Sequence, residues 1–192
     1  IVWQFTQQRI SYSNSGAQVG LMLASKYIPG KLWSLFSRSA SPGMENIPTR
    51  VVVAAGLYEQ GVSILAGACI IATIQLPSHY APATILATLL LLVAGHMSAQ
   101  KLAGESTGVY RPGFYIAPYL LLNLTLNLLA WLIISWSAVL ISEAILREAA
   151  PSPLVLAKAY IGSVIAGFLA LVSPGGLGVR EGALTYALAE HL

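Results

Sequence analysis

Residues 171–182 read LVSPGGLGVREG and interrupt a long apolar run with a proline and a group of glycines, before the chain reaches an Arg-Glu pair. Pro174 has no backbone N–H to donate, and glycine adopts positive φ angles without a steric penalty. The glycines of this stretch are Gly175, Gly176 and Gly178. We therefore predict that a helix running in from Ile161 ends here and that the chain restarts as a helix near Val179.

The composition indicates a membrane protein. Of the 192 residues, 56% are hydrophobic and 9% are charged, and the mean hydropathy is +0.72. A soluble domain carries about a quarter charged residues. Three runs without Asp, Glu, Lys or Arg separate Glu59 from Lys101, Arg111 from Glu143 and Lys158 from Arg180. Because about 20 such residues cross a bilayer, we predict one all-α transmembrane domain over residues 1–192, a polytopic integral membrane helical bundle.

The apolar runs predict membrane helices at about residues 51–76, 83–98, 118–146 and 154–172. The segment 16–28 is short for a crossing and runs into Pro29 and Gly30, so we expect a half-helix or a re-entrant element there. Apolar residues at helical spacing follow Lys31 and predict an interfacial amphipathic helix. Asn123 and Asn127 either line a cavity or, as we favour, bond neighbouring helices.

The distribution of basic residues predicts the orientation. If the spans alternate, the segments 26–50 and 101–111 and the region of Arg180 lie on one side and hold seven of the ten Lys and Arg residues. That side is expected to be cytoplasmic, which makes the chain a multi-pass protein of the cytoplasmic (plasma) membrane. The net charge of +3 is small and the basic residues are scattered, so nucleic-acid binding is not expected.

The break at Pro174 has two interpretations. The first is a helix C-cap at the membrane interface followed by a polar loop. The second is a helix start that faces an anion inside a protein-lined cavity, because non-helical backbone in a membrane must be buried or line a watery space. A second Pro-Gly element, YIPGKLWSLFSR, spans residues 27–38 and also leads to a cation. Paired interruptions of this kind are compatible with an inverted repeat and point to a transporter site.

Three elements in order, KYIPGKLWSLFSR, Tyr58-Glu59-Gln60 and SPGGLGVREGAL, resemble the transmembrane region of lysylphosphatidylglycerol synthases and the wider flippase-like family. The resemblance begins at about Ser25. It implies a polytopic protein that translocates or handles lipids with anionic or modified head groups. Family members often place Arg directly after the membrane Glu, where this chain has Gln60. They also continue with further helices at both ends, so we expect this chain to be a fragment of a longer flippase-like domain.

The pattern and the resemblance together predict a lipid flippase-like protein that binds a phosphate head group. Arg180 and the backbone N–H groups after Pro174 would hold the phosphate, Glu181 would orient Arg180, and Glu59 would act as a counter-charge or a proton-linked site. The predicted lipid- and phosphate-binding residues are Lys31, Arg38, Glu59, Ser173, Gly175, Gly176, Gly178, Arg180 and Glu181, and the predicted helix breaks are at Pro29, Gly30 and Pro174. The expected ligands are an anionic phospholipid or a polyprenyl phosphate, and the expected protein partners are a membrane subunit or a glycosyl- or aminoacyl-transferase.

Each of these charged residues also has a simpler explanation. Arg180 is then a cytoplasmic cation that obeys the positive-inside rule, and Lys31 and Arg38 are cations that snorkel to the membrane surface. Glu59 is then an interfacial residue. Glu143 and Arg147, four residues apart, are best explained as an exposed ion pair.

The sequence offers no catalytic site. It contains no aspartate, and the three histidines, His79, His96 and His191, lack metal-ligand spacing. GGLGVREG departs from both nucleotide-binding loop patterns, and no strand precedes it. We therefore predict no catalytic residue, no metal and no cofactor. The alternative to a flippase is an accessory or scaffolding subunit whose Pro-Gly breaks shape an interface with a partner.

Overall fold

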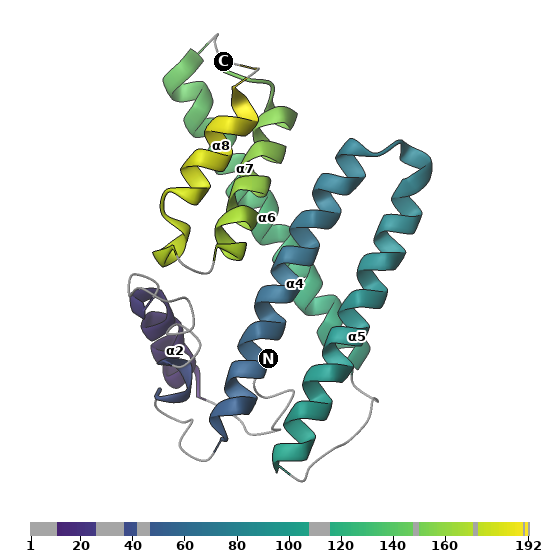
Figure 1. Ribbon diagram of the computed structural model, residues 1–192, viewed down its shortest axis with the longest axis vertical. Helices are drawn as coiled ribbons and strands as arrows, with labels where there is room; N and C mark the ends of the chain where they lie inside the picture. The colour runs from purple at the N-terminus through teal and green to yellow at the C-terminus, as the bar shows by residue number, and fades with distance from the viewer. Residues whose placement is uncertain are drawn as a thin grey trace.

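The structure is a computed structural model that describes residues 11–25, 37–41, 47–107, 116–147, 150–170, 173–189 and 191 (Figure 1). Within these ranges the chain is helical and has no strand, which confirms the all-α prediction. The elements are α2 (Tyr12–Ser25), α4 (Thr49–Gln75), η1 (Ser78–Tyr80), α5 (Ala81–Thr107), α6 (Ile116–Leu146), α7 (Pro153–Leu169), η3 (Pro174–Gly176) and α8 (Val179–Leu188).

Three segments are long and apolar enough to cross a membrane: Thr49–Gln75, Ser78–Lys101 and Leu120–Leu146. α4 and α6 match the predicted spans within two residues at each end. α5 continues nine residues past the predicted end at Ser98. The sequence after Ser98, AQKLAGEST, is too polar to be predicted as part of a membrane span. It is nevertheless rich in good helix formers, so the helix continues through it.

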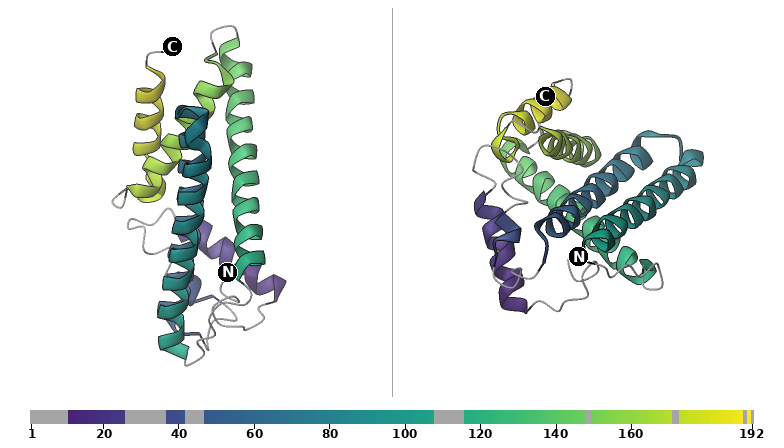
Figure 2. Two further views of the ribbon diagram at one scale, coloured as in Figure 1. Left: turned by 90° about the vertical axis from the view of Figure 1, so that its right-hand side faces the viewer. Right: turned by 60° about the horizontal axis from the view of Figure 1, so that its bottom comes forward.

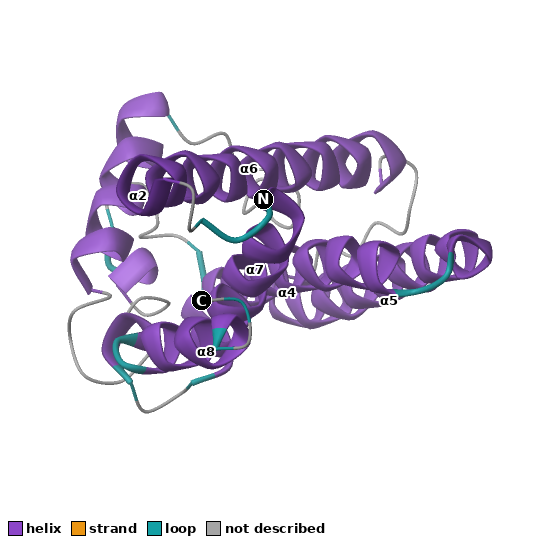
Figure 3. Cartoon of the chain, turned by 90° about the horizontal axis from the view of Figure 1, so that it is seen from above, coloured by secondary structure: helices purple, strands orange, loops and turns teal. Residues whose placement is uncertain are grey.

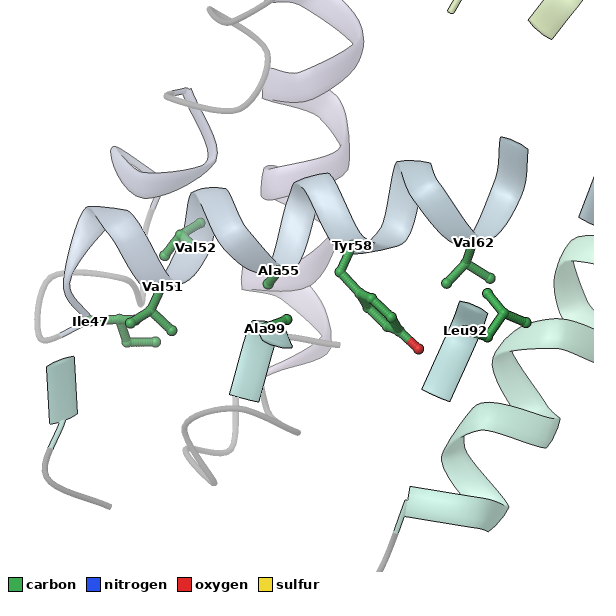
Figure 4. Close-up of a cluster of buried hydrophobic side chains, with 8 residues drawn as sticks. All are labelled: Ile47, Val51, Val52, Ala55, Tyr58, Val62, Leu92 and Ala99. Carbon is green, nitrogen blue, oxygen red and sulfur yellow. The ribbon is translucent and has the colours of Figure 1, made fainter. Parts of the chain in front are cut away.

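α4 lies at the centre of the bundle and contacts α5, α6 and α7. The right-hand view of Figure 2 shows it between α5 and α7. One buried cluster joins its first half to α5, with Val52 of α4 fully buried (Figure 4). Its members are Ile47, Val51, Val52, Ala55, Tyr58, Val62, Leu92 and Ala99. These are apolar and mostly β-branched or small side chains, so this hairpin is held by ordinary side-chain packing.

A second cluster joins the later half of α4 to α6 and α7, with Trp131 of α6 at its centre. The Trp131 Nε1–H donates to the carbonyl of Ser63 at 2.9 Å. A Cβ on Gly67 would lie 2.9 Å from the indole, at Trp131 Cε2. Gly67 is therefore a glycine because the indole occupies the space of its side chain.

α7 runs antiparallel to α4 and ends beside its middle. A Cβ on Gly162 would lie 4.0 Å from Ile71 Cδ1, and a Cβ on Gly67 would lie 3.2 Å from Ile165 Cδ1. Because Ile165 lies beside Gly67 and the two helices are antiparallel, the last residue of α7, Leu169, lies at the level of Ser63. The chain then reverses, and α8 packs along α7, so the two form a hairpin (Figures 1 and 3).

The hairpin confirms the predicted helix break, with η3 at Pro174 and a new helix beginning at Val179. The position of its turn differs from the one expected if the spans alternate. α7 has 17 residues and a length of about 25 Å, less than the roughly 30 Å of a bilayer core. The alternating arrangement expected from loop charges would have put Arg180 at an end of the bundle, whereas the hairpin turn lies halfway along α4.

The N-terminal helix differs from its prediction in its start. α2 begins at Tyr12, four residues before the expected start, because the preceding polar residues Ser13 and Asn14 belong to the helix rather than to a loop. The predicted helix break at Pro29 and Gly30, Lys31 and most of the amphipathic helix lie outside the described residues. Residues 37–39 are helical, and the hydroxyl oxygens of Ser25 and Ser37 lie 3.0 Å apart.

Two side-chain predictions on α6 are wrong. Asn127 Nδ2 donates to the carbonyl and the side-chain oxygen of Asn123, at 2.9 and 3.2 Å, so this amide bonds within its own helix rather than to a neighbour. Within the described residues Glu143 and Arg147 form no ion pair. Arg147 has a φ of 51° and has left the helical conformation, so the i,i+4 geometry that such a pair needs is lost.

Candidate functional site

The turn between α7 and α8 depends on its glycines. Gly175, Gly176 and Gly178 have φ angles of 61°, 79° and 81°, in the region that side chains disfavour. The Gly176 N–H donates to the carbonyl of Ser173 at 3.1 Å, and the Ser173 hydroxyl donates to the carbonyl of Leu177 at 2.5 Å. Ser173, predicted as a ligand of the lipid phosphate, thus uses its hydroxyl proton to close the turn.

The turn touches α7 backbone to backbone. A Cβ on Gly176 would lie 2.9 Å from the Cα and 3.0 Å from the carbonyl oxygen of Gly167. A side chain on Gly176 would not fit at this contact, so glycine is required there. The contact fixes the start of α8 against the last turn of α7.

Arg180 lies across the same part of α7. A Cβ on Gly167 would lie 2.6 Å from Arg180 Nε, so the side chain runs over the bare backbone of that glycine. The guanidinium carbon of Arg180 stands 5.7 Å from the centroid of the Phe168 ring, within the range of a cation–π interaction. Arg180 Nε is buried and has no hydrogen-bond partner within the described part of the chain. Packing against Gly167 and Phe168 therefore holds the guanidinium, and its Nε–H donor has no acceptor in the described residues.

Glu181 does not orient Arg180, and that prediction is wrong. A carboxylate oxygen of Glu181 accepts a hydrogen bond from the Gly178 N–H at 2.6 Å and caps α8. A carboxylate in the first turn is also favoured by the helix dipole. Because Glu181 is engaged with the backbone, the positive charge of Arg180 has no carboxylate partner among the residues that the structure describes.

Arg38 and Glu59, two predicted site residues from distant parts of the sequence, form an ion pair of 2.8 Å between Nη1 and Oε2. The Arg38 side chain is 11% exposed and the Glu59 side chain 39% exposed. The Arg38 carbonyl accepts from the Ser41 hydroxyl at 2.6 Å, and Arg38 Nε is buried without a hydrogen-bond partner in the described residues. The carboxylate of Glu59 thus meets an arginine that comes from before α4 in the sequence.

The ion pair lies beyond the end of α7 on the same face of α4. Glu59 is seven residues before Ala66, two helical turns, so both residues share one face. Ala66 is buried against Ile161 and Val164 of α7. Ile165 of α7 lies beside Gly67 of α4. Glu59 is eight residues before Gly67, and Gly167 is two residues after Ile165 on the antiparallel helix. At about 1.5 Å per residue, Glu59 and Gly167 therefore lie about 9 Å apart along the axis of α4.

Phe168 lies between Arg180 and the core of the bundle. Its ring packs against the buried cluster around Trp131 and Ala66. The guanidinium of Arg180 rests on this ring, near the end of α7. We call the residues Arg38, Glu59, Gly167, Phe168, Gly176 and Arg180 the hairpin junction.

Sequence reasoning found the charged residues of the hairpin junction and missed its framework. Of the two glycines of α7, Gly167 has the closer neighbours: a Cβ there would lie 2.6 Å from Arg180 Nε, whereas a Cβ on Gly162 would lie 4.0 Å from Ile71 Cδ1. Gly167 and Phe168 look like ordinary members of an apolar helix in the sequence. Lys31, Pro29 and Gly30 lie outside the described residues. Within the part of the chain that the structure describes, no group of His, Cys and Glu has the geometry of a metal site.

Searches against protein-family models, curated proteins and solved structures found no match to this chain.

Proposed function

We propose that this chain is a flippase-like membrane protein that binds a lipid through an anionic phosphate head group and moves that head group across the cytoplasmic membrane. The observation that carries the proposal is Arg180. Its guanidinium is fixed halfway along the bundle, without a carboxylate partner and with a buried Nε that lacks an acceptor in the described residues. A buried donor without an acceptor is costly, and a phosphate oxygen would satisfy it.

The surface supports placement in a bilayer. α5 and α6 carry many large apolar side chains that are more than half exposed: Leu86, Leu90, Leu91, Leu122, Leu126, Ile133 and Ile141. Such a surface fits lipid chains better than water. In the proposed arrangement α4, α5 and α6 cross the membrane, and the end with Arg50 and Lys101 is cytoplasmic.

In this arrangement α7 and α8 form a re-entrant hairpin that enters from the opposite side. Its tip, with the non-helical backbone at Pro174 to Gly178, would lie inside the membrane. Non-helical backbone at that depth has to be buried in protein or line a watery cavity. The cation at the tip gives that cavity its function, because charged groups inside a membrane mark the pathways of ions and substrates.

The mechanism follows from the chemistry of these groups. Arg180 binds the phosphate through charge-assisted hydrogen bonds, and Phe168 holds the guanidinium in place. The Arg38–Glu59 pair offers further donors from Arg38 closer to the cytoplasmic end. A head group can thus pass between two arginines at different depths, while the acyl chains stay in the lipid along the exposed apolar faces.

The test is a lipid-translocation assay in proteoliposomes with head-group-labelled phosphatidylglycerol and a labelled polyprenyl phosphate. Wild-type protein is compared with Arg180→Ala and with Gly167→Ala, whose new Cβ displaces the Arg180 side chain. Arg50→Ala is the matched control, because Arg50 is an exposed arginine at the start of α4. We expect protein-dependent translocation to fall about tenfold or more in both test variants and to persist in the control.

Absence of translocation by folded wild-type protein would reject the proposal in favour of an accessory or scaffolding subunit. Equal loss in Arg180→Ala and Arg50→Ala would reject the role of Arg180, because it would show a general effect of positive charge. Thermal unfolding in detergent checks that each variant is folded.

A further inference from the structure

We propose that water enters the bundle from the end with Arg50 and Lys101 and reaches the tip of the α7–α8 hairpin through a polar vestibule. The vestibule deepens the proposed function, and rests on it, because it gives the side from which a head group approaches the hairpin. Its walls are polar side chains of α4 and α6: Glu59, Gln60, Ser63 and Asn127.

One face of α4 changes from apolar to polar at the level where α7 ends. Ala66, Gly67 and Ile70 pack in the cluster that α4 shares with α6 and α7. Seven residues before each of them, two helical turns earlier, the same face carries polar residues: Glu59, Gln60 and Ser63. The last residue of α7, Leu169, lies at the level of Ser63, so the polar part of the face begins where the cover by α7 ends.

The polar part of this face is partly exposed, whereas Ala66 under α7 is fully buried. Gln60 and Ser63 are half-buried, and Glu59 keeps 39% of its side chain exposed. Glu59 is paired with the cation of Arg38 at 2.8 Å and lies about 15 Å from the start of α4. A charged side chain that is exposed this deep in a membrane helix has to face water, because contact with lipid chains is costly.

α6 contributes a polar residue at the same depth. Asn127 precedes Trp131 by four residues, about one helical turn, and is half-buried. The Trp131 Nε1–H donates to the Ser63 carbonyl at 2.9 Å, which fixes the level of α6 against α4. Ser135, one turn past Trp131 and under α7, is only 7% exposed. Polarity alone therefore does not make a position accessible, and the accessible ones lie beyond the end of α7.

The outer sides of the same two helices are apolar at this depth. Leu57 of α4 and Leu126 of α6 are 53% and 56% exposed. Each helix thus presents leucine outward and polar side chains toward the side on which α7 lies. This division suits lipid on one side and water on the other.

The test measures which positions water reaches, by thiol labelling in membrane vesicles. The test variants are Gln60→Cys, Ser63→Cys and Asn127→Cys, each combined with Cys69→Ser because Cys69 is the single cysteine of the chain. The reagent is (2-trimethylammonioethyl) methanethiosulfonate, a cation that does not cross membranes and that reacts with the thiolate of cysteine. It is added to inside-out vesicles, which expose the cytoplasmic end, and separately to right-side-out vesicles.

The controls lie on the same two helices. Leu57→Cys and Leu126→Cys test the lipid-facing sides at similar depths. Ile71→Cys and Ser135→Cys test positions under α7, where a Cβ on Gly162 would lie 4.0 Å from Ile71 Cδ1. We expect the three test positions to be labelled from the cytoplasmic side about tenfold faster or more than these four controls, because a thiolate forms only where water is present.

The vestibule is rejected if the test positions react no faster than their controls, or if they react faster from right-side-out vesicles. Rapid labelling of Ile71→Cys and Ser135→Cys would also reject it, because water would then pass beyond the end of α7. The assay measures no transport, so none of these results removes the proposed function. Rapid labelling of Leu57→Cys and Leu126→Cys would instead reject the placement of α4 and α6 in lipid, and the proposed function with it.

Discussion

The two hairpins of this bundle differ in one contact, which lies at the turn of the shorter hairpin. α4 and α5 are both 27 residues long and meet through apolar side chains, with Tyr58 and Leu92 among the buried ones. α7 and α8 have 17 and 10 residues and pack through side chains such as Leu156 and Leu188, and at the turn between them Gly176 of η3 also lies against the backbone of Gly167. Side-chain packing tolerates local change, whereas a backbone contact does not. The short hairpin can hold an arginine in place for this reason, and it is also the more fragile of the two.

The largest effect is expected from Gly176→Val, which attacks the backbone contact of the short hairpin. The substitution imposes a side chain at a φ of 79° and places its Cβ 2.9 Å from Gly167 Cα. Strain and overlap together are expected to cost about 2–6 kcal/mol of the free energy of unfolding. Thermal unfolding in detergent, followed by circular dichroism, measures the loss.

The control is Gly182→Val on α8, where nothing lies within 4 Å of the new Cβ. It is expected to unfold within about 0.5 kcal/mol of wild type. Equal destabilisation by the two valines would contradict the difference between the hairpins.

The next effect is expected from Gly67→Ala, at the contact between α4 and α6. The added methyl would lie 2.9 Å from the Trp131 indole and 3.2 Å from Ile165 Cδ1. Overpacking is expected to cost about 1–3 kcal/mol. Gly61→Ala on the same helix meets nothing within 4 Å and is expected to gain up to about 1 kcal/mol, so thermal unfolding of the pair should move in opposite directions. Two shifts of the same sign would refute the close fit at Trp131.

A smaller effect is expected from Glu181→Ala, which removes the cap of α8. The Gly178 N–H loses its acceptor at 2.6 Å, and the first turn loses a favourable negative charge. The expected cost is about 1 kcal/mol of unfolding free energy, typical of a lost N-terminal cap. Glu143→Ala, an exposed carboxylate without an ion-pair partner in the described residues, should stay within about 0.5 kcal/mol. The cap is refuted if the two alanine variants unfold alike.

The sequence predicted the elements with strong local signals and missed what depends on packing. Hydropathy located α4 and α6, and Pro174 with its glycines located the break, because both signals are carried by consecutive residues. The depth of the hairpin depends on where α7 contacts α4, which no run of residues encodes. The role of Glu181 was misjudged because a cap and an ion pair with a neighbour have the same sequence signature, a carboxylate in the first turn.

For the charged residues too, the sequence identified the residues but not their contacts. Arg38, Glu59 and Arg180 were identified because charges are rare in this chain, and each is conspicuous in its apolar surroundings. The pairing of Arg38 with Glu59 was not predicted, since 21 residues separate them. Gly167 was overlooked because one glycine in an apolar helix carries no signal until the residue that lies on it is known.

The smallest effect is expected from Gly95→Ala, which tests the tolerance of the long hairpin. A Cβ on Gly95 would lie 3.8 Å from the Tyr58 ring, an ordinary van der Waals contact, so the methyl fills space without displacing its neighbour. The variant is expected to equal wild type or to gain up to about 1 kcal/mol, because alanine favours the helix over glycine. The matched comparison is Gly67→Ala, the same substitution one interface away on α4. If Gly95→Ala unfolds as easily as Gly67→Ala, then α4 and α5 are packed as tightly as the helices around Trp131, and the expected tolerance of the long hairpin is refuted.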